Sequence, residues 1–489
     1  MEQHPLAGLE PAGVFRFFEE ICAIPHGSRN TKAISDYLVQ FARDRGLRFR
    51  QDEWNNVVIF QPGTPGYEDH PPVILQGHMD MVCEKEPDCP LDFARDGLDL
   101  THDGTDIFAR GTTLGGDDGI AVAYALALLD ARDLPHPPLE VIITVDEEIG
   151  MLGAAAIDLS DLQGRRMVNL DSEDEGVLTV SCAGGATASM DLPLSRRPVY
   201  GPCVELLVDG LQGGHSGVEI HKNRANANKV MGELLVRIQE KMPVCIVSLS
   251  GGAKDNAIPR SCRVNLVAMG LDLDLIRTLA ESLQAEARGR YDDPALTISV
   301  REAEALGGMA MSTDDSKQAA ALLQAVPNGV QAMSRDIEGL VQTSLNLGIA
   351  QIQEDRLHLT FSVRSSVNEE KESLLQQLRD IAGDFHAAYS QMGEYPAWEY
   401  RKDSPLRDLM VQTYRQMFGG EPQVVAIHAG LECGLLGAGS GLRVLRSPDA
   451  GHSHQPGKAE HRLHRPDVEL PAGNFKAFIR SVYNSLCKF

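Results

Sequence analysis

The chain has 489 residues, of which 43% are hydrophobic, and its formal net charge is −24 at pH 7. This composition excludes a disordered chain, and the length exceeds that of one ordinary core, so we expect two domains. So acidic a chain lacks the general positive field that attracts nucleic acids and anionic membranes, and we expect neither as a partner.

The sequence predicts neither export nor a membrane span. The N-terminal stretch, MEQHPLAGLEPAGVFRFFEE, has no basic start and no long apolar core. We find no window with the roughly 20 apolar residues that a membrane helix requires. The nine cysteines are scattered without a CxxC pair, which fits reduced thiols better than disulfides or a thiolate zinc site. We therefore expect a cytoplasmic protein.

The first part of the chain alternates helices with strands. The apolar run PPVILQG, at 71–77, is typical of a strand buried on both faces. The helix expected over 117–131 begins with acidic residues, which the helix dipole favours there. This alternation predicts an α/β sheet covered by helices. The other expected elements are a helix over 31–46 and strands over 55–63, 139–148 and 165–174.

After about residue 185 the pattern changes to strands of alternating polarity, which are typical of one-sided sheets. We interpret 185–395 as an α+β domain inserted between two segments of the first domain, 1–184 and 396–489. The expected strands of the insert cover 203–210, 244–252, 261–270 and 356–366, and its helices cover 226–240 and 371–389. The returning segment is expected to form a helix over 404–419, a strand and turn over 422–430 and a closing helix over 474–489.

Four polar clusters follow apolar strands or begin a helix. They are His78/Asp80, Asp117/Asp118, Asp146/Glu147/Glu148 and Asp171/Glu173/Asp174. Ligands of an α/β sheet bind at the carboxyl ends of its strands, so these clusters should converge. Packed carboxylates repel one another, and divalent cations would compensate that charge. Carboxylates with imidazole suit zinc or related metals, with two ions about 3.5–4 Å apart if Asp117 or Asp118 bridges them.

Spacing suggests roles within these clusters. Asp80 lies two residues after His78 and projects to the same side of an extended chain, where it could accept the other ring N–H of a metal-bound imidazole. Glu147 and Glu148 are adjacent and point to opposite sides, so one is expected as a metal ligand and the other as a general base. Simple exposure of one of the two is the alternative.

Two histidine-containing segments are candidates for further contacts. The segment DAGHSHQPGKAEHRLHRPD holds four histidines, most of which fit a polar surface loop, but one of them could supply a second imidazole to the metals. His215 lies among glycines in LQGGHSGVEIH, where tight turns are permitted. It either has no role or reaches the substrate from the inserted domain.

The motifs GHMDMVCEK, GTTLGGDDGIAVA, TVDEEIGMLGA, NLDSEDEG, GGHSGVEIHKNRANANK, DNAIPR, VRSS and HAGLECGLL occur nearly end to end. In these motifs the chain resembles the di-zinc metallopeptidase clan that includes carboxypeptidase G2-like enzymes and aminoacylases. More narrowly, it resembles the aminoacyl-histidine (cytosolic non-specific, or Xaa-His) dipeptidase family. The resemblance implies an α/β zinc-peptidase-like catalytic domain, with a central mixed, mostly parallel sheet flanked by helices, and an inserted α+β lid domain.

The resemblance also implies the metal ligands, which would bind two Zn²⁺ ions, with Co²⁺ or Mn²⁺ as substitutes. His78 and Asp171 would bind one ion, Glu148 would bind the other, and Asp117 would bridge both. Asp80 would orient the ring of His78.

The remaining roles follow from the same resemblance. Glu147 would be the general base and acid, and His215 would stabilise the oxyanion, in this clan often from the partner subunit of a homodimer. Asn256, Arg364 and Gly430 would bind the substrate. Arg364 would hold the dipeptide carboxylate through two parallel hydrogen bonds.

Two departures from the family pattern affect these expectations. The family has GADN where this chain has GGDD, and we expect Asp118 to lie outside the first coordination shell. The last family ligand sits in an H-x-P stretch, which His454 matches here, with His452 as the alternative. The predicted function is hydrolysis of unblocked dipeptides. The alternatives are an N-acyl-amino-acid deacylase and a metal-binding protein without catalysis.

Overall fold

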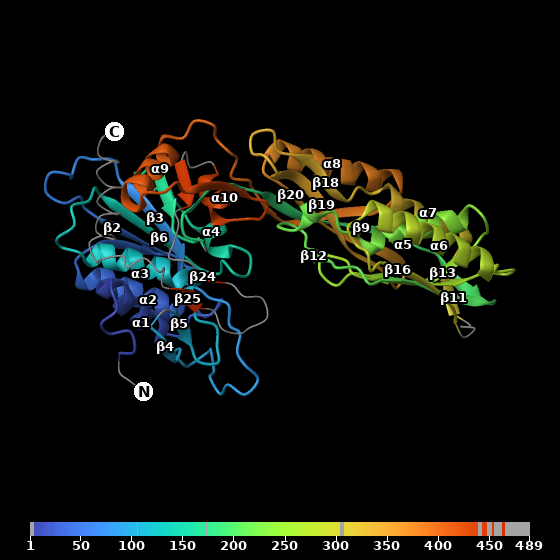
Figure 1. The fold of residues 1–489 in the computed structure, drawn as a ribbon, viewed down its shortest axis with the longest axis horizontal. Coiled ribbons are helices and arrows are strands. Elements are labelled where there is room, and N and C mark those ends of the chain that lie inside the picture. The colour runs from blue at the N-terminus through green and yellow to red at the C-terminus, as the bar shows by residue number, and fades with distance from the viewer. Residues whose placement is uncertain are drawn as a thin grey trace. The chain divides into compact units, whose positions relative to one another are not determined.

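The computed structural model describes residues 4–104, 106–172, 174–303, 308–438, 443–446, 452–453 and 462–464. The chain folds into two compact units (Figure 1). Unit 1 contains the described residues up to Ser181, Tyr400–Ala426 and those from Leu431 onward, and unit 2 contains Cys182–Glu399 and Ile427–Gly430. The short return of 427–430 to unit 2 is not evident in the sequence. The closing helix expected over 474–489 lies outside the described residues.

Unit 1 is built on an eight-stranded sheet with the order β1-β2-β6-β3-β7-β23-β8-β22. The four central strands, β6, β3, β7 and β23, pair in parallel. The β1–β2, β2–β6 and β23–β8 pairs are antiparallel, so the sheet is mixed and its parallel part lies in the centre. The strands of this sheet are β1 (Arg48–Gln51), β2 (Val57–Gln61), β3 (Val73–His78), β6 (Leu139–Thr144), β7 (Arg166–Asn169), β8 (Val177–Cys182), β22 (Gln423–Ile427) and β23 (Arg443–Arg446).

Helices cover this sheet, and Figure 1 shows α3 and α1 on one side of it and α9 on the other. Every residue of β3 and of β6 is buried, as expected for central strands enclosed between helical layers. A smaller four-stranded sheet has the order β24-β25-β5-β4. The remaining elements of unit 1 are α1 (Ala12–Cys22), α2 (Lys32–Asp44), β4 (Leu100–His102), β5 (Asp106–Ala109), α3 (Gly116–Asp130), α4 (Leu152–Ala156), α9 (Pro405–Phe418), α10 (Glu432–Gly437), β24 (His452–Ser453) and β25 (Arg462–His464).

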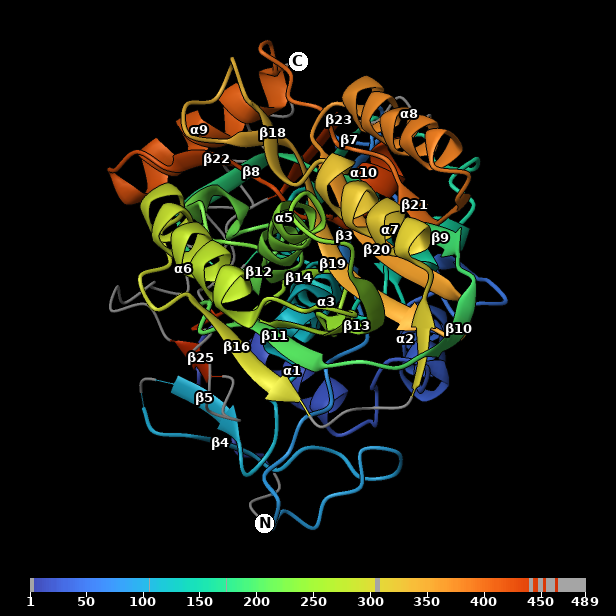
Figure 2. The ribbon, with the colours of Figure 1, turned by 90° about the vertical axis from the view of Figure 1, so that its right-hand side faces the viewer.

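Unit 2 is an α+β unit with a nine-stranded sheet, in which the strands follow the order β16-β11-β15-β13-β19-β20-β9-β21 and β18 pairs with β19. The strand pairs of this sheet are antiparallel, and Figure 2 shows α5, α6 and α7 side by side against it. Its strands are β9 (Gly184–Pro193), β11 (Cys203–Asp209), β13 (Cys245–Gly251), β15 (Cys262–Val267), β16 (Thr297–Ala303), β18 (Gly329–Met333), β19 (Val341–Gln353), β20 (Arg356–Ser365) and β21 (Ala388–Tyr395).

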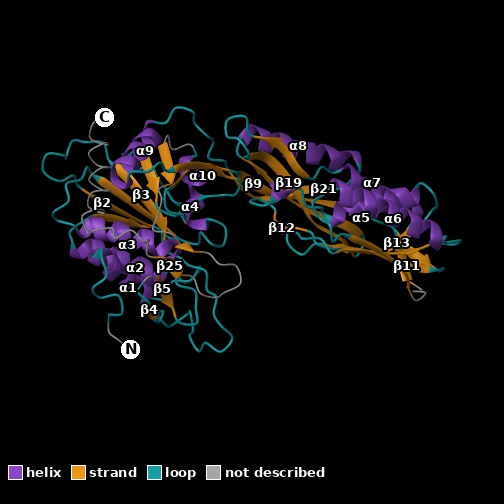
Figure 3. Cartoon of the chain, in the orientation of Figure 1, coloured by secondary structure: helices purple, strands orange, loops and turns teal. Residues whose placement is uncertain are grey.

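The other elements of unit 2 are its helices and two short strand pairs, as Figure 3 shows in the colours for helix and strand. The two-stranded sheets are β10-β17 and β12-β14. These elements are β10 (Arg196–Val199), β12 (Gly214–His215), a 3₁₀ turn (Ile220–Lys222), α5 (Ala227–Gln239), β14 (Ala257–Ile258), α6 (Leu273–Arg290), β17 (Gly308–Met311), α7 (Thr313–Ala325) and α8 (Asn368–Asp384). In the described part of the chain, none of the helices has the length and apolar character needed to cross a bilayer.

Candidate functional site

The polar residues that follow the central strands of unit 1 converge at one edge of the sheet. His78 is the last residue of β3, Glu147 and Glu148 follow β6, and Asp171 lies two residues beyond β7. These three strands are adjacent and parallel, so their carboxyl ends meet at the same edge. Asp117 reaches this edge from the first turn of α3.

Two groups of side chains in this region have the geometry to hold a metal ion. One consists of His78, Asp117 and Glu148, and the other of His78, Asp118 and Asp171; within each group one potential ligand atom per residue lies within 4.8 Å of the others. Nε2 of His78 is 3.1 Å from Oδ1 of Asp117. The donor set, an imidazole with carboxylates and without thiolates, fits an exchangeable site for zinc or a related metal.

Asp118 lies nearer to the other candidate ligands than the sequence suggests. Its side chain is buried, and its Oδ2 accepts the backbone N–H of His78 at 3.1 Å. The peptide bond between Asp117 and Asp118 is cis, and both residues have non-helical backbone angles at the start of α3. Its place outside the coordination shell stays a prediction.

Asp80 contacts the His78 ring mainly through its backbone. Nδ1 of His78 lies 3.0 Å from the carbonyl oxygen of Asp80 and 3.5 Å from its carboxylate Oδ1. The carboxylate is held instead by two other donors, the Ser28 hydroxyl at 2.8 Å and the Glu147 backbone N–H at 3.1 Å. Either acceptor on Asp80 would keep a proton on Nδ1 of His78, which leaves Nε2, on the side of Asp117, as the atom that a cation would bind.

The carboxylates of this edge lie close together and are partly or fully buried, so their negative charges repel one another. Burial, together with neighbouring carboxylates such as Asp171, raises the pKa of Glu147 to about 9 against the lowering effect of His78. Burial likewise raises the pKa of Glu148 to about 7. Burial alone would lower the pKa of His78, but the Asp117 and Asp80 carboxylates outweigh it and raise this pKa well above the usual value. Bound cations would relieve this strain between like charges.

His215, Asn256, Arg364 and Gly430 all belong to unit 2. His215 ends β12, which pairs with β14 so that His215 lies opposite Ala257, the residue after Asn256. The Asn256 carbonyl accepts the backbone N–H of Ser216 at 2.9 Å, and the Asn256 side chain is exposed. The structure therefore brings His215 and Asn256 together.

The loop around His215 fixes the form of its ring. Nδ1 of His215 accepts the backbone N–H groups of Gly217 and Val218 at 3.1 and 3.2 Å. A ring nitrogen that accepts hydrogen bonds carries no proton, so the proton of the neutral imidazole is on Nε2. Burial and the charge of Arg364 lower the pKa of His215, which agrees with a neutral ring whose Nε2–H is a donor.

Arg364 is a cation for which the described residues provide no ion pair. Its Nη1 donates to the Tyr395 hydroxyl at 3.2 Å, and its buried Nε has no hydrogen-bond partner. Burial, followed by the charge of Arg364, lowers the pKa of His428 to about 3. Gly430 leaves room for Tyr395, because a Cβ at this position would lie 2.7 Å from the ring.

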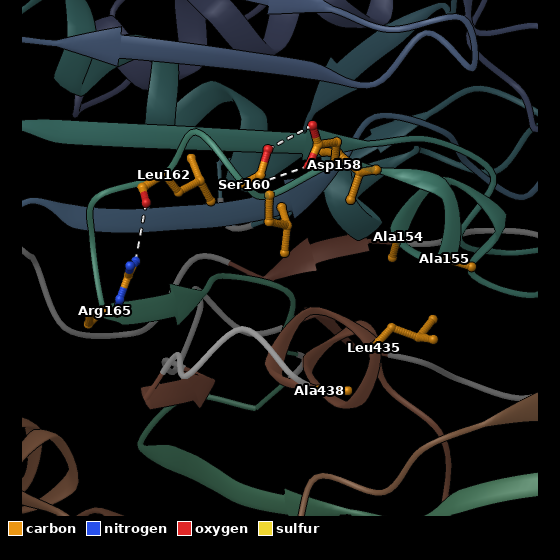
Figure 4. Close-up of a pocket in the computed structure, with 10 residues that line it drawn as sticks. Ala154, Ala155, Asp158, Ser160, Leu162, Arg165, Leu435 and Ala438 are labelled. Carbon is orange, nitrogen blue, oxygen red and sulfur yellow. Dashed lines mark hydrogen bonds between the residues drawn. The ribbon is translucent and has the colours of Figure 1, made fainter.

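A pocket of about 520 Å³ in unit 1 lies apart from these clusters, between the α4 segment and α10 (Figure 4). Its charged side chains already have local partners. Asp158 accepts the backbone N–H and the hydroxyl of Ser160, both at 2.9 Å, and Arg165 donates to the Leu162 and Gly164 carbonyls. We assign no role to this pocket in the chemistry.

Some expected contacts lie outside the described residues, and two residues escaped the sequence analysis. His454 falls outside the described residues, and the side chain of His452 does too. Neither Tyr395 nor Glu432 was predicted to have a role. Glu432 lies inside HAGLECGLL, so the motif itself was the available signal, whereas Tyr395 lies in no recognised pattern.

Comparisons with known proteins identify the family of the chain. Residues 74–461 match the family described as Peptidase family M20/M25/M40. The chain is 36% identical over 439 residues to the cytosol non-specific dipeptidase of Escherichia coli (strain K12), covering 88% of this chain and 89% of the relative.

Solved structures give the same result. The aminoacylhistidine dipeptidase of Vibrio alginolyticus superposes with a TM-score of 0.88 at 33% identity, covering 97% of this chain and 98% of that one. The aminopeptidase PepT of Bacillus cereus, at a TM-score of 0.54 and 14% identity over 97% of this chain and 98% of that one, shares the fold. The chain therefore belongs to the M20/M25/M40 peptidase family and is a peptide-bond hydrolase.

Proposed function

We propose that the chain is a metal-dependent dipeptidase that hydrolyses unblocked dipeptides, Xaa-His dipeptides among them, in the cytoplasm. The observation that carries this proposal is the convergence of His78 with four carboxylates at one edge of the sheet, beside Glu147. Two dipeptidases among the similar proteins, with which the chain shares at least 33% identity, support the substrate class.

The proposed metal centre holds two Zn²⁺ ions, for which Co²⁺ or Mn²⁺ substitute. His78 and Asp171 would hold one ion, Glu148 would hold the other, and Asp117 would be shared by both. His454 completes the centre, with His452 as the alternative. When bound, such ions supply Lewis-acid polarisation of the peptide carbonyl and acidify water.

Glu147 moves the proton in this reaction. Its carboxylate takes a proton from the attacking water and delivers it to the leaving amine nitrogen, so no separate acid is needed. The Asp80 carboxylate accepts the backbone N–H of Glu147. Asp80 therefore positions the general base as well as the His78 ring.

His215 and Arg364 act on the negatively charged oxygens of the substrate. Nε2–H of His215 donates to the developing oxyanion, and the ring does not need to rotate because its Nδ1 is held by the backbone. Arg364 binds the dipeptide carboxylate through its guanidinium, which Tyr395 steadies on one side. Asn256 lies beside His215, where the β12 and β14 segments pair, and contributes to substrate binding. Gly430 contributes indirectly, because the absence of a side chain there leaves room for the Tyr395 ring.

We also propose a homodimer, with His215 acting on the site of the partner subunit. Analytical ultracentrifugation gives the mass of the assembly. Mixing an inactive Glu147→Gln chain with an inactive His215→Ala chain then tests the exchange: activity that reappears on mixing supports it, and activity that stays absent contradicts it.

A panel of free and N-acetylated dipeptides tests the activity itself. Turnover of the free dipeptides, lost on treatment with EDTA and restored by Zn²⁺, supports the proposal. Faster turnover of the N-acetylated series would favour a deacylase, and zinc binding without any turnover would favour a non-catalytic metal-binding protein. Activity that survives both EDTA and Glu147→Gln would contradict the mechanism.

A further inference from the structure

A buried layer of polar side chains lies directly beneath the candidate metal ligands. It contains Gln76, Thr144 and Asn169, from β3, β6 and β7, which are each at most 1% exposed. Gln76 and Asn169 stand two positions before the candidate ligands His78 and Asp171, and Thr144 is the last residue of β6, which Glu147 and Glu148 follow. Residues two apart on a strand share a face, so Gln76 lies one step below His78 on β3.

Glu432, the first residue of α10, joins this layer from a distant part of the sequence. Its side chain is 1% exposed. Its Oε2 accepts hydrogen bonds from Nε2 of Gln76 at 2.6 Å and from the hydroxyl of Thr144 at 2.9 Å. Oε1 of Gln76 in turn accepts Nδ2 of Asn169 at 2.6 Å. One carboxylate therefore connects β3 and β6 directly and β7 through Gln76, at the edge where these strands present the candidate ligands.

Structural stability alone does not explain a carboxylate at this position. No Lys or Arg among the described residues forms an ion pair with Glu432, and its Oε1 is buried without a hydrogen-bond partner. Burying such a group costs free energy, whereas a neutral glutamine would accept the same two hydrogen bonds. What favours a negative charge here is positive charge nearby, which the proposed pair of cations would supply.

The geometry points to Glu432 as a positioning residue of the metal centre. It fixes the ends of β3, β6 and β7 relative to one another through Gln76 and Thr144, and it adds a buried negative charge beneath the cations. This inference rests on the proposed metal centre, and Glu432 itself is not proposed as a ligand.

Glu140 offers a matched control, because it is a second buried glutamate of the same sheet with a structural environment. It lies near the other end of β6, is 4% exposed and accepts the backbone N–H groups of Gln163 and Gly164, both at 2.9 Å. A change from Glu to Gln at this position perturbs folding without touching the edge that carries the ligands.

The test compares E432Q and E140Q by zinc titration calorimetry and by the melting temperature of the metal-free protein. We expect E432Q to bind Zn²⁺ about tenfold more weakly, as for other residues that support metal ligands, with the melting temperature unchanged or raised. E140Q is expected to lower the melting temperature and keep the zinc affinity. An E432Q protein that binds Zn²⁺ like the wild type would overturn the inference, whatever its stability.

A second variant keeps the test decisive if E432Q does not fold. Thr144→Val removes one donor to Glu432 while the charge stays, and we expect a measurable loss of zinc affinity that is smaller than that of E432Q. Unchanged affinity in this variant would contradict the positioning role. A wild-type protein that binds no Zn²⁺ would refute the proposed function itself, which separates the two failures.

Discussion

The polar clusters of the two units have opposite electrostatic character. In unit 1, an imidazole is surrounded by carboxylates, and burial raises the pKa of Glu148 and of Glu432 to about 7. In unit 2, Arg364 stands near two histidines, and burial together with its charge lowers the pKa of His428 to about 3. In the first cluster the carboxylates outnumber the single imidazole, and in the second the described residues provide no ion pair for Arg364.

This contrast indicates what each cluster is suited to bind. The acidic cluster favours cations, because each carboxylate becomes easier to ionise when positive charge is added. The cluster of Arg364 and neutral imidazoles offers hydrogen-bond donors to a carboxylate or an oxyanion. The predictions below test whether the two clusters divide the work of one reaction in this way.

The largest effect is expected for Glu147→Gln in unit 1. The amide cannot accept the water proton, so kcat should fall by about 10²- to 10⁴-fold. Zinc titration should show unchanged binding, because Glu147 is not a proposed ligand. A variant that keeps most of its kcat would remove the general base from the mechanism.

The His215→Ala change in unit 2 tests the oxyanion donor. Loss of Nε2–H should lower kcat by about 10²- to 10³-fold, with a smaller change in KM. His221→Ala, an exposed histidine in the same loop region, serves as the control and should leave both constants unchanged. A His215→Ala effect confined to KM would indicate substrate binding in place of transition-state stabilisation.

Arg364→Lys tests recognition of the substrate carboxylate. Lysine keeps the charge but loses the paired geometry, and a hydrogen bond to a charged group is worth about 1.5–3 kcal/mol. We expect kcat/KM on dipeptides to fall by about 10- to 100-fold, mainly through KM. Arg356→Lys on the same strand β20, where Arg356 pairs with Asp191, is the control. If Arg364→Lys lowers kcat/KM on dipeptide amides as much as on dipeptides with a free carboxylate, Arg364 does not recognise the carboxylate.

The smallest effect concerns the pH dependence of stability in unit 2. The pKa of His428 is about 3 in the folded protein and about 6.5 in an unfolded chain. The unfolded chain therefore binds more protons between these values, and the folded state loses stability as the pH falls below 6.5. His428→Asn lacks this loss, so between pH 7 and 5.5 its unfolding free energy should fall by about 1 kcal/mol less than that of the wild type.

Urea unfolding of the metal-free protein measures this difference. The chain has two tryptophans, so Trp398, in unit 2, reports alone in a Trp54→Phe background. Equal pH dependence in the His428→Asn and parent proteins would mean that this imidazole titrates normally and that the contrast between the clusters is overstated.

Much of the acidic cluster was predictable because strand periodicity determines where side chains point. The run at 71–77 predicts a strand enclosed on both faces and the run at 139–148 predicts a strand, and the structure buries every residue of β3 and of β6. The mixed sheet and the family were predicted as well. The parallel pairing is limited to the central strands, because β1, β2 and β8 run antiparallel at the two sides.

The details that escaped prediction depend on contacts and backbone angles that hydrophobic periodicity does not encode. Glu432 meets Gln76 across 356 residues of sequence, and periodicity carries no information about such a pairing. The tautomer of His215 depends on the direction of two backbone N–H groups in its loop. Asp118 has non-helical backbone angles, which the helical sequence pattern of α3 does not predict.

The central claim is that the acidic edge of unit 1 is a cation site on which hydrolysis depends. The most direct test is to remove metal with EDTA, add Zn²⁺ in steps, and follow bound metal by mass spectrometry alongside dipeptide turnover. We predict that the metal-free protein is inactive, that activity returns as two equivalents bind, and that His78→Ala neither binds both ions nor regains activity. A metal-free protein with full turnover, or a His78→Ala variant with two ions and wild-type activity, would contradict the account.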